Sequence, residues 1–280
     1  MLCDTNRPYH RAMADPAPAD HEEEAAWSDA RLAANPHHDP EKAARVRDMF
    51  AAIAKSYDLN NRLHSFGLDQ SWRRRTVREV MRRLGRVDLR GTRVLDVACG
   101  TGDLSEAFAD QGATVTGVDF TPPMLDIARE KAKMRRRRAG SAPAYAHGDA
   151  TRLTQPDATF DAVSIAFGLR NVGDVAAAMR EFRRVLKPGG VLAVLEFGLP
   201  AWGPARFAHR LYTERVMPIT ATIIARDRSG AYRYLPRSVD TFLSPEGVAQ
   251  AATAAGLADT ETKRLTMGTC AITTAMRGSV

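Results

Sequence analysis

Short apolar runs and amphipathic stretches alternate along the chain from Gly91 to residue 277. Runs rich in Val, Ile, Leu and Ala predict strands, and the stretches between them have the apolar spacing of helices. Strands that alternate with helices of about ten to fifteen residues are typical of parallel βαβ units wound on both faces of a sheet. We expect strands at 92–98, 113–119, 143–149, 160–167, 190–197, 257–265 and 269–277, with helices at 103–111, 122–136, 175–187 and 245–256. The predicted fold is α/β, with a doubly wound, seven-stranded, mostly parallel sheet of Rossmann-like type.

The region before Gly91 has a different pattern. Residues 1–40 are rich in Ala, Pro, Asp, Glu and His without a sustained period, so we expect a disordered acidic extension. Residues 41–90 predict two helices, of which the first is amphipathic and ends near Tyr57 and the second covers 70–84. These helices would form a lid on a single domain that spans 41–280. A further helix is expected at 203–226, where Pro218 should kink or split it.

The segment "LDVACGTG" has the features of a ligand-binding turn. A strand stops abruptly, Gly100 and Gly102 leave room for a ligand, and a helix begins next to them. A dinucleotide site would need a third glycine where Ser105 stands, and the acids Asp96 and Asp103 would repel a pyrophosphate. They suit a cationic ligand such as S-adenosylmethionine, which carries a sulfonium and an ammonium. A tight turn without any ligand is the alternative.

Acidic side chains also follow the next two predicted strands. Asp119 ends the second strand, where a carboxylate can accept hydrogen bonds from ribose hydroxyls. Asp149 and Ala150 follow the third strand, where an acid can accept a hydrogen bond from an adenine amino group. Asp149 alone would be read as a turn residue. In series with Asp96 and Asp119, it is predicted to bind the cofactor.

These motifs resemble the class I S-adenosylmethionine-dependent methyltransferases, and more narrowly the ubiquinone and menaquinone biosynthesis C-methyltransferases. The narrower resemblance covers about residues 41–277 and rests on "MFAAIAKSYDLNNRLHSFGLDQSWRR", "LDVACGTGD", "IAFGLRNVGD", "REFRRVLKPGGVLAVLEFGLP" and the closing segments "YRYLPRSVDTFLSPEGVAQAATAAGL" and "LTMGTCAITTAMR". The resemblance implies cofactor contacts from Thr101, Asp119, Asp149 and Ala150. Ala166 stands where the family commonly has serine, so only a backbone contact is expected there.

The resemblance also implies the acceptor, a polyprenylated quinol that is methylated on a ring carbon. Methyl transfer from a sulfonium needs alignment and an activated nucleophile, and no metal is required. Some group must hold or remove the hydroxyl proton of the quinol. The candidates are Arg170, Asn171 and Tyr57, and an arginine can stabilise a phenolate by its charge. Asp58, Asn60 and His64 are weaker candidates, of which His64 is read as an ordinary loop histidine.

Composition limits the partners and the compartment. The three cysteines form no CxxC pair, no run is long enough to span a bilayer, and no signal peptide is recognisable, so a cytoplasmic protein is expected. The net charge of +7 is concentrated outside the acidic first 40 residues, above all in "SWRRRTVREVMRRLGRVDLRG". This segment and "RLYTERVMPITATIIAR" are predicted to associate with the membrane surface that holds the polyprenyl tail, although the second could instead pack on the sheet or form a homodimer interface.

Two other functions stay open on the sequence. The basic charge also fits a methyltransferase that acts on RNA. Aromatic residues are only 7% of the chain and are not interleaved with the arginines, and no appended RNA-binding module is recognisable, so nucleic acid is not the expected partner. The second alternative is a non-catalytic, cofactor-binding partner of a quinone-synthesis complex.

Overall fold

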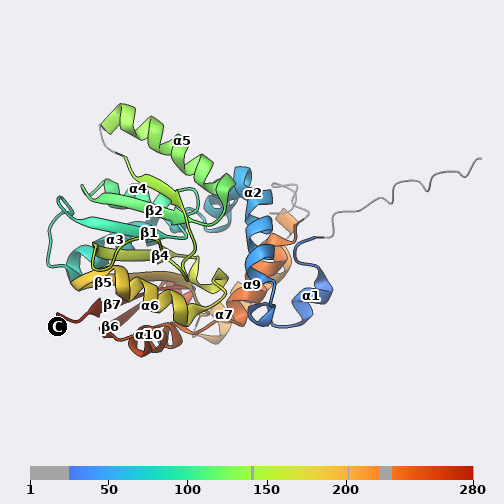
Figure 1. Ribbon diagram of the computed structural model, residues 1–280. Coiled ribbons are helices and arrows are strands. Elements are labelled where there is room, and N and C mark those ends of the chain that lie inside the picture. Colours follow the sequence, from blue (N-terminus) through green and yellow to red (C-terminus); the bar gives the residue numbers. More distant parts are fainter. Residues whose placement is uncertain (1–24, 140–141, 201, 218, 221–228, 280) are drawn as a thin grey trace, which may run out of the picture.

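The computed structural model describes residues 25–139, 142–200, 202–217, 219–220 and 229–279, and contains one seven-stranded sheet (Figure 1). The strand order is β3-β2-β1-β4-β5-β7-β6. The first five strands are parallel, and β7 runs antiparallel to both β5 and β6. The strands are β1 (Arg93–Val97), β2 (Thr114–Asp119), β3 (Ala144–His147), β4 (Phe160–Ala166), β5 (Leu186–Phe197), β6 (Leu257–Leu265) and β7 (Cys270–Arg277). The predicted doubly wound α/β fold is confirmed.

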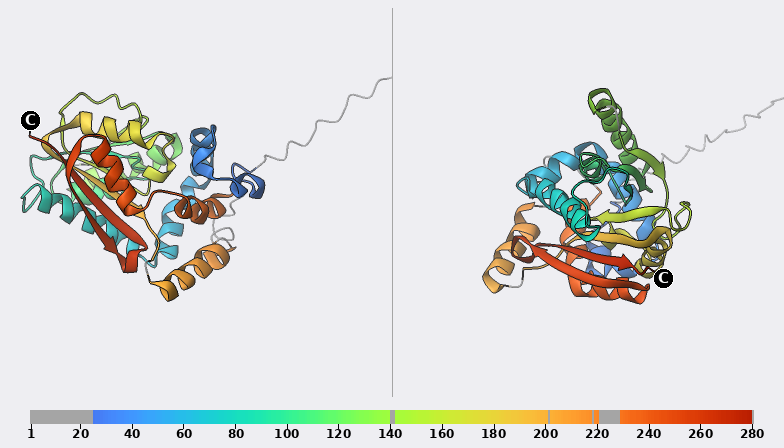
Figure 2. Two further views of the ribbon diagram at one scale, coloured as in Figure 1. Left: turned by 90° about the horizontal axis from the view of Figure 1, so that it is seen from below. Right: turned by 90° about the vertical axis from the view of Figure 1, so that its left-hand side faces the viewer.

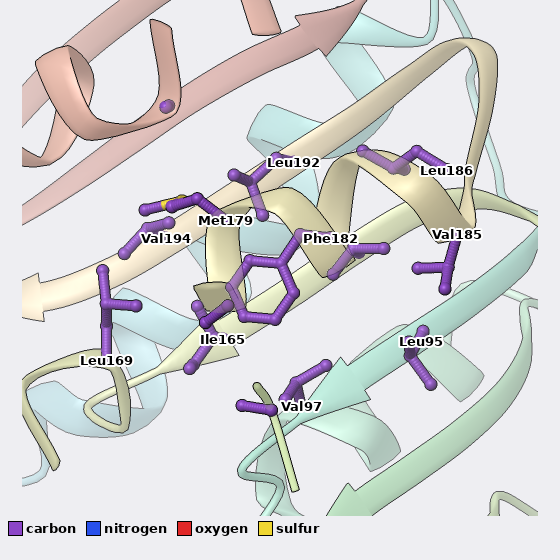
Figure 3. Packing of buried hydrophobic residues seen from close by; sticks show 14 of the residues in the cluster. Leu95, Val97, Ile165, Leu169, Met179, Phe182, Val185, Leu186, Leu192 and Val194 are labelled. Carbon is purple, nitrogen blue, oxygen red and sulfur yellow. The ribbon is translucent and has the colours of Figure 1, made fainter. Parts of the chain in front are cut away.

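Helices cover both faces of the sheet because side chains alternate between its two sides. On β1, Leu95 faces a core that includes Met179 and Phe182, whereas Val94 faces a second core that includes Phe108. Figure 3 shows the first of these cores, with Phe182 packed between the strands and the helix that carries it. The helices of the sheet domain are α3 (Leu68–Arg83), α4 (Asp103–Ala109), α5 (Pro122–Ala139), α6 (Val175–Val185) and α10 (Pro245–Ala254).

A separate group of helices stands at one end of the sheet. Helix α2 (Lys42–His64) lies beside α9 (Ala231–Asp240), and the short α1 (Asp29–Ala33) lies next to α9 in both figures (Figures 1 and 2). These helices share a third apolar core, in which Trp27 stacks on Tyr234 with ring centroids 4.6 Å apart. The remaining elements are α7 (Gly203–Leu211), the π-helix η3 (Tyr212–Val216) and the 3-10 turns η1 (Pro36–His38), η2 (Leu169–Asn171) and η4 (Thr266–Gly268). The two helices predicted within residues 41–90 are therefore present as α2 and α3, but only α2 stands in this group, because α3 packs on the sheet.

Three sequence predictions need correction. Disorder is wrong for residues 25–40, because Trp27 is fully buried and this segment packs on α9; residues 1–24 lie outside the described residues. Helix α2 does not end near Tyr57 but continues to His64, because no helix-breaking residue precedes Gly67, which has a φ of +74°. The helix predicted at 203–226 is confirmed as far as Val216; Pro218 and residues 221–228 lie outside the described residues. No helix in the described ranges is long and apolar enough to cross a membrane.

Candidate active site

A cavity of about 360 Å³ opens at the carboxyl ends of β1, β2 and β4, below α2. Parallel sheets commonly bind ligands at this edge, and the volume lies within the usual range for small-molecule sites. Seven of the residues predicted from the sequence line it, namely Tyr57, Gly100, Asp119, Asp149, Ala150, Ala166 and Asn171. Asp119 and Asp149, the acids that the sequence predicts to bind ribose and adenine, therefore lie in one cavity.

The glycine turn is held by a carboxylate from the neighbouring strand. Asp119 accepts hydrogen bonds from the backbone N–H of Gly100 at 2.9 Å and from that of Thr121 at 2.8 Å. Gly102 has a φ of +87°, and a Cβ at this position would lie 2.2 Å from Oη of Tyr145. Glycine is thus required at Gly102 both for its backbone conformation and for its lack of a side chain. Burial raises the pKa of Asp119.

The prediction that Asp96 contacts the cofactor is not supported by its position. Its carboxylate accepts hydrogen bonds from the hydroxyls of Ser105 at 2.6 Å and Ser164 at 2.8 Å, and it does not line the cavity. Along β1 the side chains alternate, so Asp96 points to the same face as Val94, below the turn and beside α4. Burial raises its pKa to about 6. Asp96 supports the turn from beneath.

Two further residues of the turn lie just outside the cavity. Neither Thr101 nor Gly102 lines it. The hydroxyl of Thr101 donates to Asp58 at 2.6 Å, and Nζ of Lys131 lies 2.5 Å from Asp58 and 2.7 Å from Asp103. Although burial opposes it, the Lys131 ammonium lowers the pKa of Asp103. Through these bonds Asp58 ties α2 to the glycine turn and to α5.

A second cavity, of about 280 Å³, lies between α2, α3, α9 and η3 and is mostly apolar. Its aromatic floor includes Phe167 and Phe197, whose ring centroids are 4.6 Å apart, and Trp72, which lies 6.2 Å from Phe167. Phe50, Tyr57 and Phe167 line both cavities and so form the wall between them. Phe167 has a φ of +57°, an uncommon conformation for a bulky residue that is often found at functional sites.

Arg170 and Asn171 both anchor the wall residue Phe167. Nη1 of Arg170 donates to the carbonyl of Phe167 at 2.7 Å and to Glu196 at 2.6 Å. Nδ2 of Asn171 donates to the same carbonyl at 3.2 Å, and the hydroxyl of Tyr234 donates to Asn171 Oδ1 at 3.0 Å. Arg170 lines this apolar cavity, whereas Asn171 lines the cavity at the strand ends. Among the described residues, Nε of Arg170 is buried without a partner.

The remaining candidates differ in position. Tyr57 lies in the wall, and burial raises the pKa of its hydroxyl. Asp58 and Asn60 line neither cavity, and the amide of Asn60 donates to the carbonyl of Ser56. His64 lies at the end of α2 and lines the apolar cavity rather than lying in a loop. No group of His, Cys, Asp and Glu within the described ranges could hold a metal ion.

Two residues of the site were not predicted. Glu196 is buried and pairs with Arg170, and Tyr234 supports Asn171 from α9. An acid at the end of the apolar run "VLAVLEF" is a signal that points to a buried partner, so Glu196 could have been found. Tyr234 lies far along the chain from Asn171, in a segment whose place against α2 follows only from tertiary packing.

Comparison with known proteins now decides the family. Residues 39–277 match the model of the ubiE/COQ5 methyltransferase family. The chain belongs to this family. A demethylmenaquinone methyltransferase from Thermus thermophilus is 45% identical over 226 residues, which are 80% of this chain and 97% of the relative. The "ubiquinone/menaquinone biosynthesis C-methyltransferase UbiE" of Geobacter sulfurreducens is 39% identical over 85% of this chain and 90% of its own length.

The fold agrees with that of solved methyltransferases. A SAM-dependent methyltransferase from Thermotoga maritima superposes with a TM-score of 0.56 over 83% of this chain and 99% of that chain, at 16% identity. The residues of the cavity at the strand ends fit S-adenosylmethionine, because Gly100 and the Asp119 carboxylate line it together with the apolar residues Phe120, Met124 and Ala150. This ubiE/COQ5 family member is an S-adenosylmethionine-dependent methyltransferase.

Proposed function

We propose that the chain methylates a ring carbon of a polyprenylated hydroquinone, either demethylmenaquinol or a 2-methoxy-6-polyprenyl-1,4-benzoquinol. One observation carries the proposal: the cavity at the strand ends, which contains Asp119 and Asp149, meets the aromatic cavity across a wall that, among the described residues, is formed by Phe50, Tyr57 and Phe167. An aromatic acceptor in the second cavity would present a ring carbon toward the first. The names of the relatives support the same acceptor class.

Within the cavity at the strand ends, the chain's residues would bind and orient the cofactor. S-adenosylmethionine, when bound, supplies a methyl group on a positively charged sulfur. We assign the ribose hydroxyls to Asp119 and the adenine amino group to Asp149, with the apolar side chain of Ala150 beside it. Ala166 would contribute a backbone contact, and Gly100 would leave space at the turn. Asp149 accepts hydrogen bonds from Thr151, which fix its carboxylate at the cavity edge.

Activation of the ring would fall to Arg170, Asn171 and Tyr57. A hydroquinone becomes a carbon nucleophile when its hydroxyl proton passes to water or is shared in a hydrogen bond, because electron density moves to the carbon beside the oxygen; after methyl transfer, that carbon would lose its own ring proton to water. The buried guanidinium of Arg170 can stabilise this phenolate through its unpartnered Nε, while Glu196 holds it in place. Asn171 would position the wall through the carbonyl of Phe167. Tyr57 would orient the ring at the point where the cavities meet.

The test is a methylation assay on purified protein under anaerobic, reducing conditions. Isotope-labelled S-adenosylmethionine is supplied with a short-chain demethylmenaquinol or with the matching methoxybenzoquinol, and the products are identified by mass spectrometry. We expect carbon methylation of at least one ring, and a large fall in kcat for Arg170→Lys, which keeps the charge but loses the fixed guanidinium geometry. Absence of methylated product with either ring would overturn the proposal.

We also propose that the face around the apolar cavity docks on a membrane surface. Phe66 lines the cavity mouth and is 78% exposed, and Phe207 on α7 is 72% exposed. Other large apolar side chains are exposed close to these two in the sequence, namely Leu63, Trp202, Leu211, Val216 and Ile219, and Met267 is exposed in η4 next to the cavity residue Thr266. A polyprenyl tail could leave the cavity here and stay in the bilayer. Arg74, Arg75 and Arg78 are exposed on α3 and would add attraction to anionic lipid.

Liposome flotation separates the two contributions to membrane docking. We expect the wild-type protein to float with anionic vesicles, Phe66→Ser with Phe207→Ser to reduce flotation on all vesicles, and glutamine at the three α3 arginines to reduce it on anionic vesicles only. Equal partitioning of the glutamine variant would refute the electrostatic contribution. The alternative is that a second copy of the chain covers this face in a homodimer. Light scattering of the protein without lipid tests it, because such a dimer should dissociate into monomers in the Phe66→Ser variant.

A further inference from the structure

His64 lines the apolar cavity, and one of its ring nitrogens, Nε2, is buried without a hydrogen-bond partner among the described residues. Its Nδ1 lies 3.0 Å from Oη of Tyr212, and that hydroxyl also donates to the backbone carbonyl of His64 at 3.5 Å. The hydroxyl has one proton and the carbonyl can only accept, so both contacts form together only if Nδ1 carries the imidazole proton. Nε2 then holds a lone pair. Tyr212 begins the π-helix η3, a type of local distortion that is frequent at functional sites.

This lone pair is buried and has no hydrogen-bond partner among the described residues. Burial lowers the pKa of His64, so the imidazole is neutral near pH 7 and Nε2 stays an acceptor. The cavity around it is mostly apolar. A buried acceptor without a donor is unfavourable, and a ligand that supplies an O–H or N–H relieves that cost.

We propose that Nε2 of His64 accepts a hydrogen bond from a hydroxyl of the ring substrate and thereby selects the reduced ring over the oxidised one. The inference rests on the proposed function. A hydroquinone carries two hydroxyl donors on opposite sides of the ring, whereas the quinone carries only carbonyl acceptors. One hydroxyl would meet His64, which leaves the other for Arg170 in the same cavity. The reduced ring is also the nucleophilic one, so the preference in binding matches the chemistry.

The experiment compares two ligands that differ in hydroxyl donors. One is 2-prenyl-1,4-naphthohydroquinone, kept reduced without oxygen, and the other is its 1,4-dimethyl ether, which cannot donate. Their dissociation constants are measured by quenching of protein fluorescence, since Trp72 lines the cavity. We expect His64→Leu to bind the hydroquinone about tenfold more weakly than wild type, with little change for the ether. His64→Gln keeps an acceptor oxygen and should retain much of the preference.

Two further variants keep the test decisive. Tyr212→Phe keeps the aromatic ring but removes the hydroxyl that holds the proton on Nδ1 of His64. It should therefore reduce the preference for the hydroquinone over the ether without loss of fold. His38→Leu is the matched control, because His38 is exposed in η1 and lines neither cavity. If the ratio of the two dissociation constants is the same as in wild type in both His64→Leu and Tyr212→Phe, the inference is overturned. The proposed function still stands in that case if wild type methylates the ring. A wild-type protein that neither binds nor methylates the hydroquinone overturns both.

Discussion

Lys42 is a buried cation whose removal should change how stability depends on pH. It is only 4% exposed, and its Nζ donates to the carbonyl of Val172 at 2.8 Å and lies 3.1 Å from Nδ1 of His37. Burial, together with the nearby charge of Arg170, lowers its pKa from 10.5 to about 8, although Glu196 opposes the shift. Val172 lines the cavity at the strand ends and follows Arg170 and Asn171 in sequence, so Lys42 connects α2 to the site.

The sign of the effect follows from proton binding. Between about pH 8 and pH 10.5 the unfolded chain keeps the Lys42 proton and the folded chain has lost it. The unfolded state then binds more protons, so the free energy of unfolding rises with pH across this window. The shift corresponds to a gain of about 2.5 kcal/mol from Lys42 between pH 7 and pH 10. The Lys42→Met variant has no such group and should lack this gain.

Urea unfolding, followed by circular dichroism at pH 7, 8.5 and 10, measures the difference in unfolding free energy between wild type and Lys42→Met. All other groups titrate in both proteins, so their contributions cancel in this difference. As the pH rises, the unfolding free energy of wild type should increase by about 2 to 3 kcal/mol relative to that of Lys42→Met. Lys55→Met is the matched control, because Lys55 is exposed on the same helix and is solvated in both states. A difference between wild type and Lys42→Met that stays constant with pH would refute the reasoning.

Three further outcomes are expected. Gly102→Ala should destabilise the fold by at least about 1–2 kcal/mol, because alanine disfavours this backbone conformation and its Cβ meets Tyr145. It should also weaken cofactor binding in calorimetry, because the displaced turn carries Gly100 in the cavity. Trp27→Ala should cost about 3–5 kcal/mol in urea unfolding, with Trp27→Phe much less affected, because the wild-type side chain is fully buried. The folded state holds the Asp96 proton more tightly than the unfolded state, so Asp96 should lower the free energy of unfolding of wild type as the pH rises from 3.8 to about 6. Asp96→Asn should lack this decrease, and unfolding curves at pH 4 and pH 6 measure it.

Local patterns were sufficient to predict the sheet and the edge at which ligands bind. The alternation of apolar runs fixed the strands, and parallel strands bring Gly100, Asp119 and Asp149 to one edge. The rule that strand ends carry ligand-binding residues also predicted Asp96 in the cavity, which it does not line. A side chain near a strand end can point either beyond the end of the sheet or onto one of its faces. That choice depends on the pleat, and here two serine hydroxyls on the face bind the carboxylate.

The apolar cavity could not be derived from spacing, because its walls come from segments far apart in the chain. Trp27 illustrates the reason. Its neighbours in sequence are polar or small and predict disorder, yet Trp27 stacks on Tyr234, and Tyr234 donates to Asn171. The stabilising contact for the N-terminal segment lies about 200 residues away, so composition within a window carries no sign of it.

The wall between the cavities explains why one segment after β4 contributes so much to the site. The carbonyl of Phe167 accepts hydrogen bonds from the side chains of Arg170 and Asn171. The backbone N–H of Phe167 donates to the carbonyl of Leu195 at 2.7 Å. These bonds hold Phe167 in a conformation that an isolated chain would rarely adopt. A change to Arg170 or Asn171 therefore moves the wall, and a change to Arg170 also alters the charge. A variant that loses activity but keeps its cofactor affinity, measured separately, has lost the activation of the ring and not the wall.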